Sequence, residues 1–388
     1  MRVLHLSSGN LYGGIETMLV TMARHRHECP ELHQEFGLCF EGRVADELYA
    51  TKADVHLFGD VRLSRPSSVW RVRRRLRAVL GKSSIDFVVC HGPWAMAVFG
   101  PAARSVRLPV VLWAHAAHTG RHWIERLAAM TRPELVIANS TYSARSAVAW
   151  LSSTPSTVIH CPVDGLSVGQ RANESRAAVR HALATDEASV VIVLAGRMEA
   201  WKGHRELLAS LGTMADNPHW HCWIVGGPQR PHEAEYFNSL VQLARTLRIG
   251  SRVQFCGQRS DVRALLAAAD LYCQPNIAPE PFGISFVEAM SCGLPVVSTA
   301  FGGALEIVDD SCGILIPPDD TAGLTHALTV LVADKKLRDQ LGCAGSIRAT
   351  TICDPQARLV EFAGALRHIN GPVSSRNHAS GLFSSAVR

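Results

Sequence analysis

The chain of 388 residues is longer than one hydrophobic core usually serves, so two domains are expected. Apolar residues make up 47% of it and charged residues 19%, a globular composition that excludes disorder over most of the length. The net charge of +5 is small, and no nucleic-acid partner is expected.

The first half of the chain alternates between strand and helix patterns. Short apolar strands are expected at 3–6, 35–40, 54–58, 87–90, 110–113 and 135–138. Helical patterns lie between several of them, which predicts a doubly wound α/β domain with a mainly parallel sheet. Ligands of such domains bind at the carboxyl ends of the strands.

A glycine-rich loop follows the first strand. It ends in Gly13-Gly14 and leads into a helix at 15–24 with one apolar face. The loop is not G-x-G-x-x-G, so the dinucleotide-binding fingerprint is absent. From the loop alone, a plain tight turn and a close approach to a ligand both remain open.

The segment 67–82 is predicted to be a basic helix. One side carries an apolar stripe, and most of the remaining surface is basic. The basic residues are Arg71, Arg73, Arg74, Arg75 and Arg77. Two interpretations stay open: a solvated outer face of the domain, or docking to an anionic lipid surface, where each arginine contributes about 1 kcal/mol.

Histidines gather after the strand at 110–113. His115, His118 and His122 could share one face of a helix and bind a metal. No acidic or cysteine partner stands beside them in the sequence, so no metal site is expected. Asn139 ends the next strand, at the edge of a cleft in folds of this kind.

A boundary between two domains is expected near residue 165. The predicted units are 1–164, 165–369 and a Ser-, Gly- and Asn-rich tail at 370–388 that is expected to be disordered. In the second unit the expected strands are 190–195, 221–225, 253–255, 271–275 and 296–299. The expected helices are 174–184, 233–247, 261–269, 324–332, 335–344 and 355–368.

Two cations follow the continuous apolar strand at 190–195. Arg197 comes two residues after it, and Lys202 five residues later. A guanidinium binds phosphate as a fork and an ammonium binds it as a mobile point charge, so the pair suits a diphosphate. The alternative is that both cations pair with acids at the surface.

The segment 280–295 places two carboxylates on either side of a helix start. Glu280 lies in a loop, Gly283 frees the backbone, and a helix can begin at Ile284 or Ser285. Glu288 then lies about one turn inside the helix. The unpaired N–H groups at the helix start suit a phosphate. The alternative is a surface loop before a core helix, with two solvated glutamates.

Several motifs together resemble one enzyme family. They are Glu280-Pro-Phe-Gly with Glu288-Ala-Met-Ser-Cys-Gly-Leu-Pro-Val-Val, the run Thr299 to Val308, the run Cys312 to Asp320, and Gly196-Arg197-Met-Glu-Ala-Trp-Lys202-Gly203. In this order they resemble the retaining glycosyltransferases of GT-B family 4. The resemblance is dense over 190–325 and sparser over 1–165.

The resemblance implies a GT-B architecture, in which two Rossmann-like domains face each other across a cleft and the last helix crosses back to the first domain. It implies metal-independent transfer, with retention, of a hexose-type sugar from a nucleotide-diphosphate donor to a glycan, lipid-linked or small-molecule acceptor. No cofactor is expected. The implied catalytic residues are Glu280, His115, Arg197 and Lys202. The implied donor-binding residues are Gly13, Gly14, Gly257, Gly283, Ile284, Ser285 and Glu288. Asn139 and Glu306 are expected to border the acceptor side of the cleft.

The implied chemistry is front-face retention. Glu280 would hold a sugar hydroxyl, Glu288 the ribose hydroxyls, and His115 would reach the donor sugar. No obvious second carboxylate supports a covalent double displacement. Two rival functions stay open: a GT-B nucleotide-sugar epimerase or hydrolase, and a non-catalytic nucleotide-sugar-binding protein.

The compartment is inferred from cysteines and hydropathy. Eleven scattered cysteines without a C-x-x-C pair favour free thiols over a disulfide framework. No signal peptide and no apolar run of about 18 residues is seen. We therefore expect a cytoplasmic protein, with any membrane contact peripheral, at the inner face.

Overall fold

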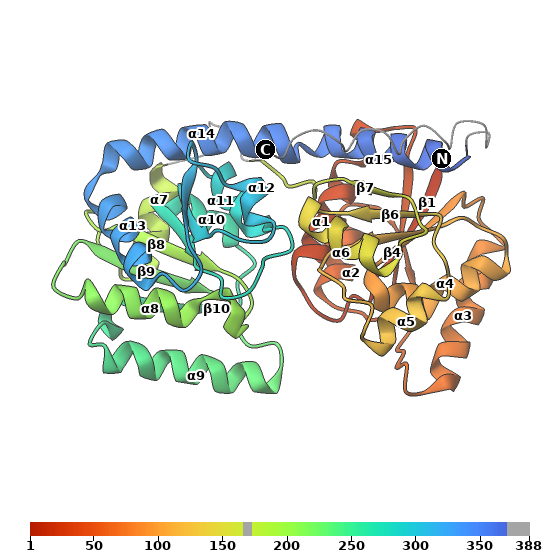
Figure 1. Ribbon diagram of the computed structural model, residues 1–388, viewed down its shortest axis with the longest axis horizontal. Helices are drawn as coiled ribbons and strands as arrows, with labels where there is room; N and C mark the ends of the chain where they lie inside the picture. Colours follow the sequence, from red (N-terminus) through yellow and green to blue (C-terminus); the bar gives the residue numbers. More distant parts are fainter. Residues whose placement is uncertain (166–172, 371–388) are drawn as a thin grey trace.

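The structure, a computed structural model, describes residues 1–165 and 173–370 as two α/β halves lying side by side (Figure 1). The expected disordered tail falls outside these residues, except for its first member. The predicted GT-B arrangement of two Rossmann-like domains is confirmed.

The first half contains a seven-stranded parallel sheet in the order β3-β2-β1-β4-β5-β6-β7. Its strands are β1 (Arg2–Leu6), β2 (His33–Leu38), β3 (Asp54–Leu57), β4 (Phe87–His91), β5 (Val110–Ala114), β6 (Leu135–Ala138) and β7 (Ser156–Val158). Its helices are α1 (Gly14–Arg24), α2 (Arg43–Ala50), α3 (Pro66–Leu80), α4 (Gly92–Ser105), α5 (Trp123–Ala129) and α6 (Thr141–Trp150), with a 3₁₀ turn, η1 (Arg26–Glu28).

The second half contains a six-stranded parallel sheet in the order β10-β9-β8-β11-β12-β13. Its strands are β8 (Val190–Ala195), β9 (Trp220–Val225), β10 (Val253–Gly257), β11 (Leu271–Gln274), β12 (Val296–Thr299) and β13 (Gly313–Ile316). Its helices are α7 (Asn173–Ala182), α8 (His204–Thr213), α9 (Pro231–Thr246), α10 (Val262–Ala268), α11 (Ile284–Ser291), α12 (Ala304–Ile307), α13 (Thr321–Ala333) and α14 (Lys335–Cys353), with η2 (Ala200–Lys202) and η3 (Gly250–Arg252).

Both sheets reverse their strand order at one point. In the first sheet this point lies between β1 and β4, and in the second between β8 and β11. Central strands such as β4 and β8 are buried along their whole length, as their continuous apolar runs predict. At the reversal, the loop after one strand leads to one face of the sheet and the loop after its neighbour leads to the other face. The two loops therefore diverge and leave a crevice for ligands at the carboxyl ends of these strands.

Some elements had no clear signal in the sequence. Helix α4 contains Gly100 and Pro101, two residues that normally interrupt a helix. A Cβ at Gly100 would lie 2.7 Å from Thr131 Cγ2, so close packing requires glycine there. Strand β7 was missed because it is a three-residue edge strand without a buried face.

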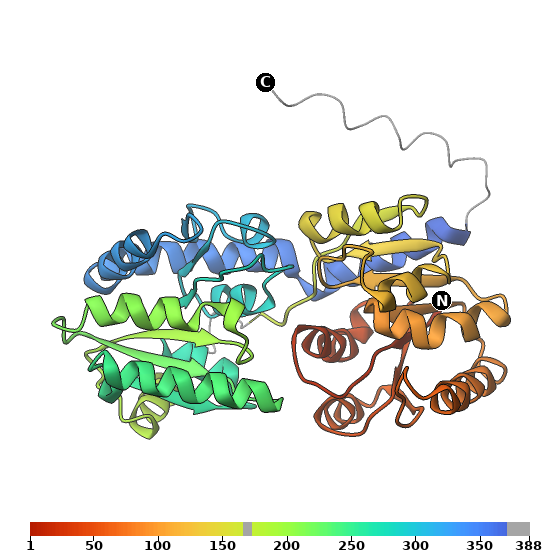
Figure 2. The same ribbon diagram turned by 60° about the horizontal axis from the view of Figure 1, so that its bottom comes forward.

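The last helix, α15 (Pro355–Asn370), continues from α14 and crosses to the first half, as Figures 1 and 2 show. Phe362 packs with its ring centroid 5.1 Å from that of Trp113 and 5.6 Å from that of His5. Helix α15 thus completes the core of the first half.

Helix α3 has the predicted amphipathic form, but its arginines are not equivalent. Arg73 donates to the carbonyl oxygens of residues 97 and 98 in α4, and Arg75 donates to that of Phe58. Arg71 and Arg74 are exposed. Over the described ranges, no helix is at once long and apolar enough to cross a membrane.

Candidate active site

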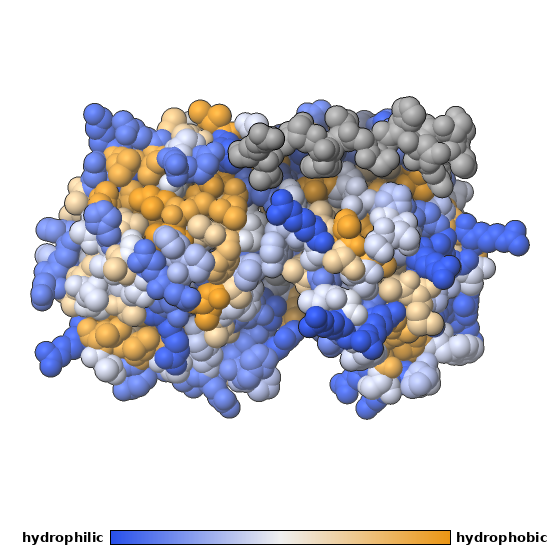
Figure 3. All heavy atoms as spheres, in the orientation of Figure 1, coloured by the Kyte–Doolittle hydropathy of each residue, from blue (hydrophilic) through white to orange (hydrophobic). Residues whose placement is uncertain are grey.

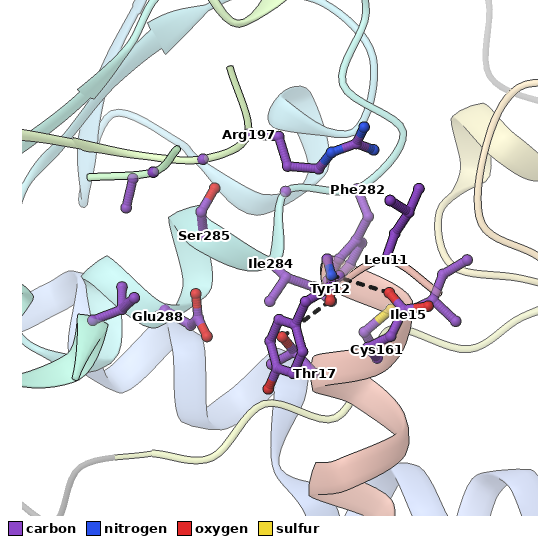
Figure 4. A pocket seen from close by; sticks show the side chains of 18 of the residues that line it. Leu11, Tyr12, Ile15, Thr17, Cys161, Arg197, Phe282, Ile284, Ser285 and Glu288 are labelled. Carbon is purple, nitrogen blue, oxygen red and sulfur yellow. Dashed lines mark hydrogen bonds between the residues drawn. The ribbon is translucent and has the colours of Figure 1, made fainter. Parts of the chain in front are cut away.

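A pocket of about 630 Å³ lies between the two halves, where the carboxyl ends of both sheets face each other. The surface is hollowed between the halves (Figure 3). In the close view, Arg197 and Glu288 lie toward opposite ends of the wall from the second half, with Ile284 and Ser285 between them (Figure 4). Tyr12 and Ile15 face them from the first half.

The glycine loop brings the first half close to the second. Gly13 is the N-cap of α1, and its N–H donates to Glu16 at 3.0 Å. A Cβ added at Gly14 would lie 3.2 Å from Ile284 Cδ1, and one at Gly13 would lie 4.0 Å from Arg197 Cδ. Larger side chains here would reach into the space between the halves.

Lys202 and Glu280 form an ion pair inside the pocket. Lys202 Nζ lies 2.5 Å from Glu280 Oε2, and the same oxygen accepts from Gln274 Nε2 at 3.2 Å. Glu280 is only 7% exposed. Among the described residues, no donor contacts Glu280 Oε1, so that oxygen is available to a ligand hydroxyl. The lysine ammonium has three donors and can hold a phosphate and Glu280 together.

Arg197 is held by two other carboxylates. Its Nη2 lies 2.9 Å from Glu233 Oε1 and 3.3 Å from Glu199 Oε1. Glu233, at the start of α9, is buried and also accepts from the backbone N–H of Gln229. Arg197 and Lys202 therefore both pair with acids, as the alternative interpretation of the sequence expected. The acids of the two shortest pairs, Glu233 and Glu280, are buried and so are not surface acids, and Glu280 lines the pocket.

The start of α11 is built to receive an anion. Gly283 adopts φ +103°, and a Cβ there would lie 2.3 Å from the Phe286 ring, so only glycine fits. Within the described chain, the backbone N–H groups of Ile284 and Ser285 have no acceptor. They are directed toward the pocket side of a helix with a positive dipole end.

Glu288 lines the pocket one turn into α11. Burial raises the pKa of its carboxyl to about 7, although Arg263 opposes the shift. Asp164 adds a like charge and raises the pKa further. A carboxylate at this site therefore gains from any ligand that supplies hydrogen-bond donors.

His115 and Asn139 meet in the pocket wall of the first half. Asn139 Nδ2 donates to the backbone carbonyl of His115 at 3.4 Å, and both residues line the pocket. The region after β5 is a loop, so His115, His118 and His122 share no helix face. The expectation that no acid stands beside them was wrong: His118 Nδ1 lies 3.2 Å from Glu125 Oε1.

Two predicted site residues lie outside the pocket wall. The carbonyl of Gly257 accepts the N–H of Gly226, and the wall beside it begins at Gln258. Glu306 crosses the junction of the halves and accepts from the backbone N–H groups of Thr141 and Tyr142 at 2.9 and 3.1 Å. In this arrangement Glu306 caps α6.

The sequence did not single out the groups that organise the site. Gln274, the last residue of β11, contacts Glu280, and its carbonyl oxygen Oε1 accepts from Ser285 at 3.3 Å. Its position at the carboxyl end of a buried strand could have identified Gln274 as a site residue from the sequence. Gln229 bonds both backbone groups of Tyr12 across the junction, at 3.2 and 3.0 Å, and no local pattern announces that contact.

Two family models match the chain. "Glycosyl transferases group 1" matches residues 175–347, and "Glycosyltransferase Family 4" matches residues 12–165. Together they cover every strand of both sheets except β1, and most of the residues that line the pocket. The two matches agree with the observed fold and with the order of the motifs. The protein is a glycosyltransferase of the GT-B class.

Similar proteins point the same way. A phosphatidyl-myo-inositol mannosyltransferase of Mycobacterium leprae is 28% identical over 281 residues, 71% of each chain. A D-inositol 3-phosphate glycosyltransferase of a Mycobacterium species is 32% identical over 203 residues, 51% of this chain and 44% of its own length. The structure of Anabaena HepE in complex with UDP-glucose has a TM-score of 0.80 and 25% identity, covering 95% of this chain and 100% of that one.

With these matches the chain belongs to the glycosyl transferases group 1 family. The family resemblance inferred from the motifs is confirmed. Several of the relatives are matched over only about half of their own length.

Proposed function

We propose that the chain transfers a hexose from a nucleotide-diphosphate sugar to a glycan or lipid-linked acceptor, with retention at the anomeric carbon and without a metal ion. The observation that carries the proposal is the arrangement of charge at one end of the second sheet. Arg197, Lys202 and the free N–H groups of α11 surround one part of the pocket. Glu280 and Glu288 stand to either side of it.

The donor would lie along α11 in this account. Its diphosphate would sit between Arg197 and Lys202 at the helix start, since two cations and unpaired backbone N–H groups meet there. The ribose hydroxyls would donate to Glu288, and a sugar hydroxyl would donate to Glu280 Oε1. Gly13 and Gly14 leave room for the diphosphate to pass between the halves.

The chemistry follows from where charge develops. As the glycosidic bond breaks, the leaving diphosphate gains negative charge and the sugar becomes oxocarbenium-like. Lys202 and the α11 N-terminus stabilise that charge more than they stabilise the bound donor. The acceptor would enter from the same face as the departing phosphate, whose oxygen takes the acceptor proton. Glu280 and Glu288 both accept from donor hydroxyls in this account, so the transfer is proposed to proceed without a covalent glycosyl-enzyme.

A uridine donor is the first to test. HepE, 25% identical over nearly the whole chain, was solved with UDP-glucose. A thermal-shift screen of UDP-, GDP- and ADP-sugars identifies the donor, since a ligand that binds only the folded state raises the melting temperature. Nucleotide release is then followed with and without acceptors. Release that accelerates with a glycan or lipid acceptor supports transfer. Release independent of any acceptor indicates a hydrolase or epimerase, and binding without release indicates a non-catalytic protein.

We also propose a peripheral contact with anionic membrane through α3, which would bring the pocket to lipid-linked acceptors. Arg71 and Arg74 are exposed, and the Arg74 guanidinium lies 5.2 Å from the ring centre of Trp70, which is 58% exposed. Trp123 at the start of α5 is also exposed. Exposed tryptophan beside arginine is typical of surfaces that meet lipid headgroups.

A further inference from the structure

Three histidines form a hydrogen-bonded chain that runs from the pocket into the core of the first half. His5 lies on β1, His91 ends β4 and His115 follows β5, and these strands are neighbours in the sheet. His115 Nε2 lies 2.9 Å from His91 Nδ1, and His91 Nε2 lies 3.0 Å from His5 Nδ1. Of the three, only His115 lines the pocket.

The chain is enclosed by aromatic rings. The His91 ring stacks on Trp113 at 5.6 Å between centroids, and Phe362 of α15 covers Trp113. His5 and His91 are 1% and 5% exposed. Burial lowers the pKa values of His5 and His115 to about 3, and burial also holds the pKa of His91 well below its usual range, so all three rings are neutral at neutral pH.

A neutral imidazole carries one N–H, so the chain can run in only two directions. In one, His115 donates to His91, His91 donates to His5, and His115 turns a bare Nδ1 to the pocket. In the other, His5 donates to His91, His91 donates to His115, and His115 turns an Nδ1–H to the pocket. The direction therefore decides whether the pocket receives an acceptor or a donor.

The buried end of the chain selects between the two directions. The amide of the buried Gln34 lies against His5 and raises the pKa of its ring against the effect of burial, but across the residues described neither amide atom of Gln34 nor His5 Nε2 makes a hydrogen bond of normal geometry. The first direction would leave an N–H at His5 Nε2, whereas the second leaves only a lone pair. An unpaired buried N–H is rarer in proteins than an under-satisfied acceptor. The second direction is therefore favoured.

We propose that His91 is a positioning residue that holds His115 in the Nδ1–H tautomer, so that His115 presents a hydrogen-bond donor to the sugar end of the pocket. This inference rests on the proposed function only in giving His115 a contact with the donor sugar. Nδ1 is the one ring nitrogen of His115 left for that contact, because Nε2 is occupied by His91. An oxygen of the sugar or of the leaving phosphate would be its acceptor.

The tautomer can be read directly from the protein without any donor. Long-range ¹H–¹⁵N correlation spectra of ¹⁵N-histidine-labelled wild type are expected to show His115 protonated at Nδ1, the less common form of a free neutral histidine. In His91→Leu, which has no donor for Nε2, His115 is expected to shift to the Nε2–H form. His204→Leu is the control, because His204 is equally buried in the second half and neither of its ring nitrogens has a partner among the described residues.

Kinetics separate positioning from packing. With the donor found by the screen, kcat of His91→Leu should fall about ten- to hundredfold, the usual effect of losing a partner that orients a functional histidine. The donor KM should change by less than about twofold, since the nucleotide is held elsewhere. Wild-type His115 protonated at Nε2, an unchanged tautomer in His91→Leu, or an unchanged kcat despite a shifted tautomer would each overturn the proposal. If no donor is turned over, the proposed function fails while the tautomer result still stands.

Discussion

The two halves repeat one architecture but equip it with different chemistry. Both sheets reverse their strand order and open a crevice at the reversal. The second half fills its crevice with charge, in the ion pairs of Arg197 and Lys202. The first half contributes glycines, the amide of Asn139 and the neutral imidazole of His115, and its charged lining residues are largely paired with one another, as Arg24 is with Glu47 and Asp164.

The difference teaches where each task of the reaction belongs. Charged groups suit the diphosphate, whose charge grows as the bond breaks. Neutral groups suit a sugar and an acceptor, which need shape and hydrogen bonds. The charges of the second half are also neutralised before a donor arrives, because Glu233 and Glu280 already hold the two cations. An incoming diphosphate joins these pairs and need not replace them.

The largest effect is expected where the charge is concentrated. Lys202→Ala or Arg197→Ala should lower turnover by about two to three orders of magnitude, as for loss of one group that stabilises transition-state charge. Steady-state nucleotide release with the identified donor measures it. Lys335→Ala is the control, because Lys335 forms an exposed pair with Asp339 on α14 and should change nothing. If either pocket variant kept wild-type turnover, the proposal that its cation stabilises the leaving diphosphate would be wrong.

The two glutamates of the charged half should separate kinetically. Glu280→Ala should lower kcat about ten- to hundredfold, because sugar geometry changes as the bond breaks. Glu288→Ala should raise the donor KM about tenfold and leave kcat nearly unchanged, because ribose contacts are similar in the ground and transition states. If both variants changed only KM, the role proposed for Glu280 would be wrong.

Donor affinity should depend on pH through Glu288. Burial raises its pKa to about 7. The carboxylate, which can accept at both oxygens, is expected to bind the two ribose hydroxyls much more strongly than the neutral acid, one of whose oxygens carries a proton. Below pH 7 the proton must leave before binding, so affinity should rise about tenfold from about pH 6 to about pH 8 and then level off. Calorimetry with the intact sugar nucleotide measures this, since its phosphodiester does not titrate there. Glu288→Gln should flatten the curve, and equal slopes in both proteins would contradict the assignment.

The junction of the halves should be weakened by Glu306→Ala. Burial alone would raise the pKa of Glu306, but hydrogen bonds from His160 and from the N–H groups of Thr141 and Tyr142 hold it at about 2. Loss of this cap should cost about 1 kcal/mol in urea unfolding at neutral pH. Its folded pKa is depressed, so the stabilisation is present above the unfolded pKa of about 4.3 and is lost as pH falls toward 2.

The control for this junction is Glu361→Ala, which breaks an exposed pair with Arg358 on α15. Exposed pairs contribute little, so its unfolding midpoint should stay near wild type. Equal losses in both variants, or a Glu306 effect that persists at low pH, would show that the cap is not what stabilises the junction.

The smallest effect is expected at the outer face of the first half. Wild type should co-sediment with anionic phosphatidylserine vesicles at low salt and dissociate near 1 M, where the screening length is about 3 Å. The double change Arg71→Gln, Arg74→Gln should weaken binding, by about 1 kcal/mol for each arginine. Lys335→Gln with Lys336→Gln removes the same charge from α14 as a control. If the two double variants sedimented equally, α3 would be interpreted as a solvated outer face and not as a membrane contact.

The sequence predicted the charged half better than the neutral one, for a physical reason. Glu280, Glu288 and the turn at Gly283 lie within one loop and helix, so local pattern predicts their arrangement. The partner of Arg197 is Glu233, 36 residues away on another helix, and only tertiary packing brings them together.

The neutral half depends on contacts between strands and between halves. His91, one residue past the strand expected at 87–90, was not singled out, because nothing in its neighbourhood reveals the ring of His115 24 residues later. Glu306 was expected at the acceptor side of the cleft from the family resemblance. Its bond to the N–H of Thr141, at the start of a helix 165 residues earlier, could not be predicted. Register between parallel strands decided such contacts, and single-sequence patterns do not encode it.

The central claim, retention by attack on the face that the diphosphate leaves, can be tested without knowing the acceptor. Water replaces the acceptor when the α-linked donor is slowly hydrolysed, and ¹H NMR distinguishes the anomers of the sugar before they equilibrate. The account predicts that the α-anomer appears first and that its appearance is lost in Lys202→Ala. Initial release of the β-anomer by the wild type would contradict it.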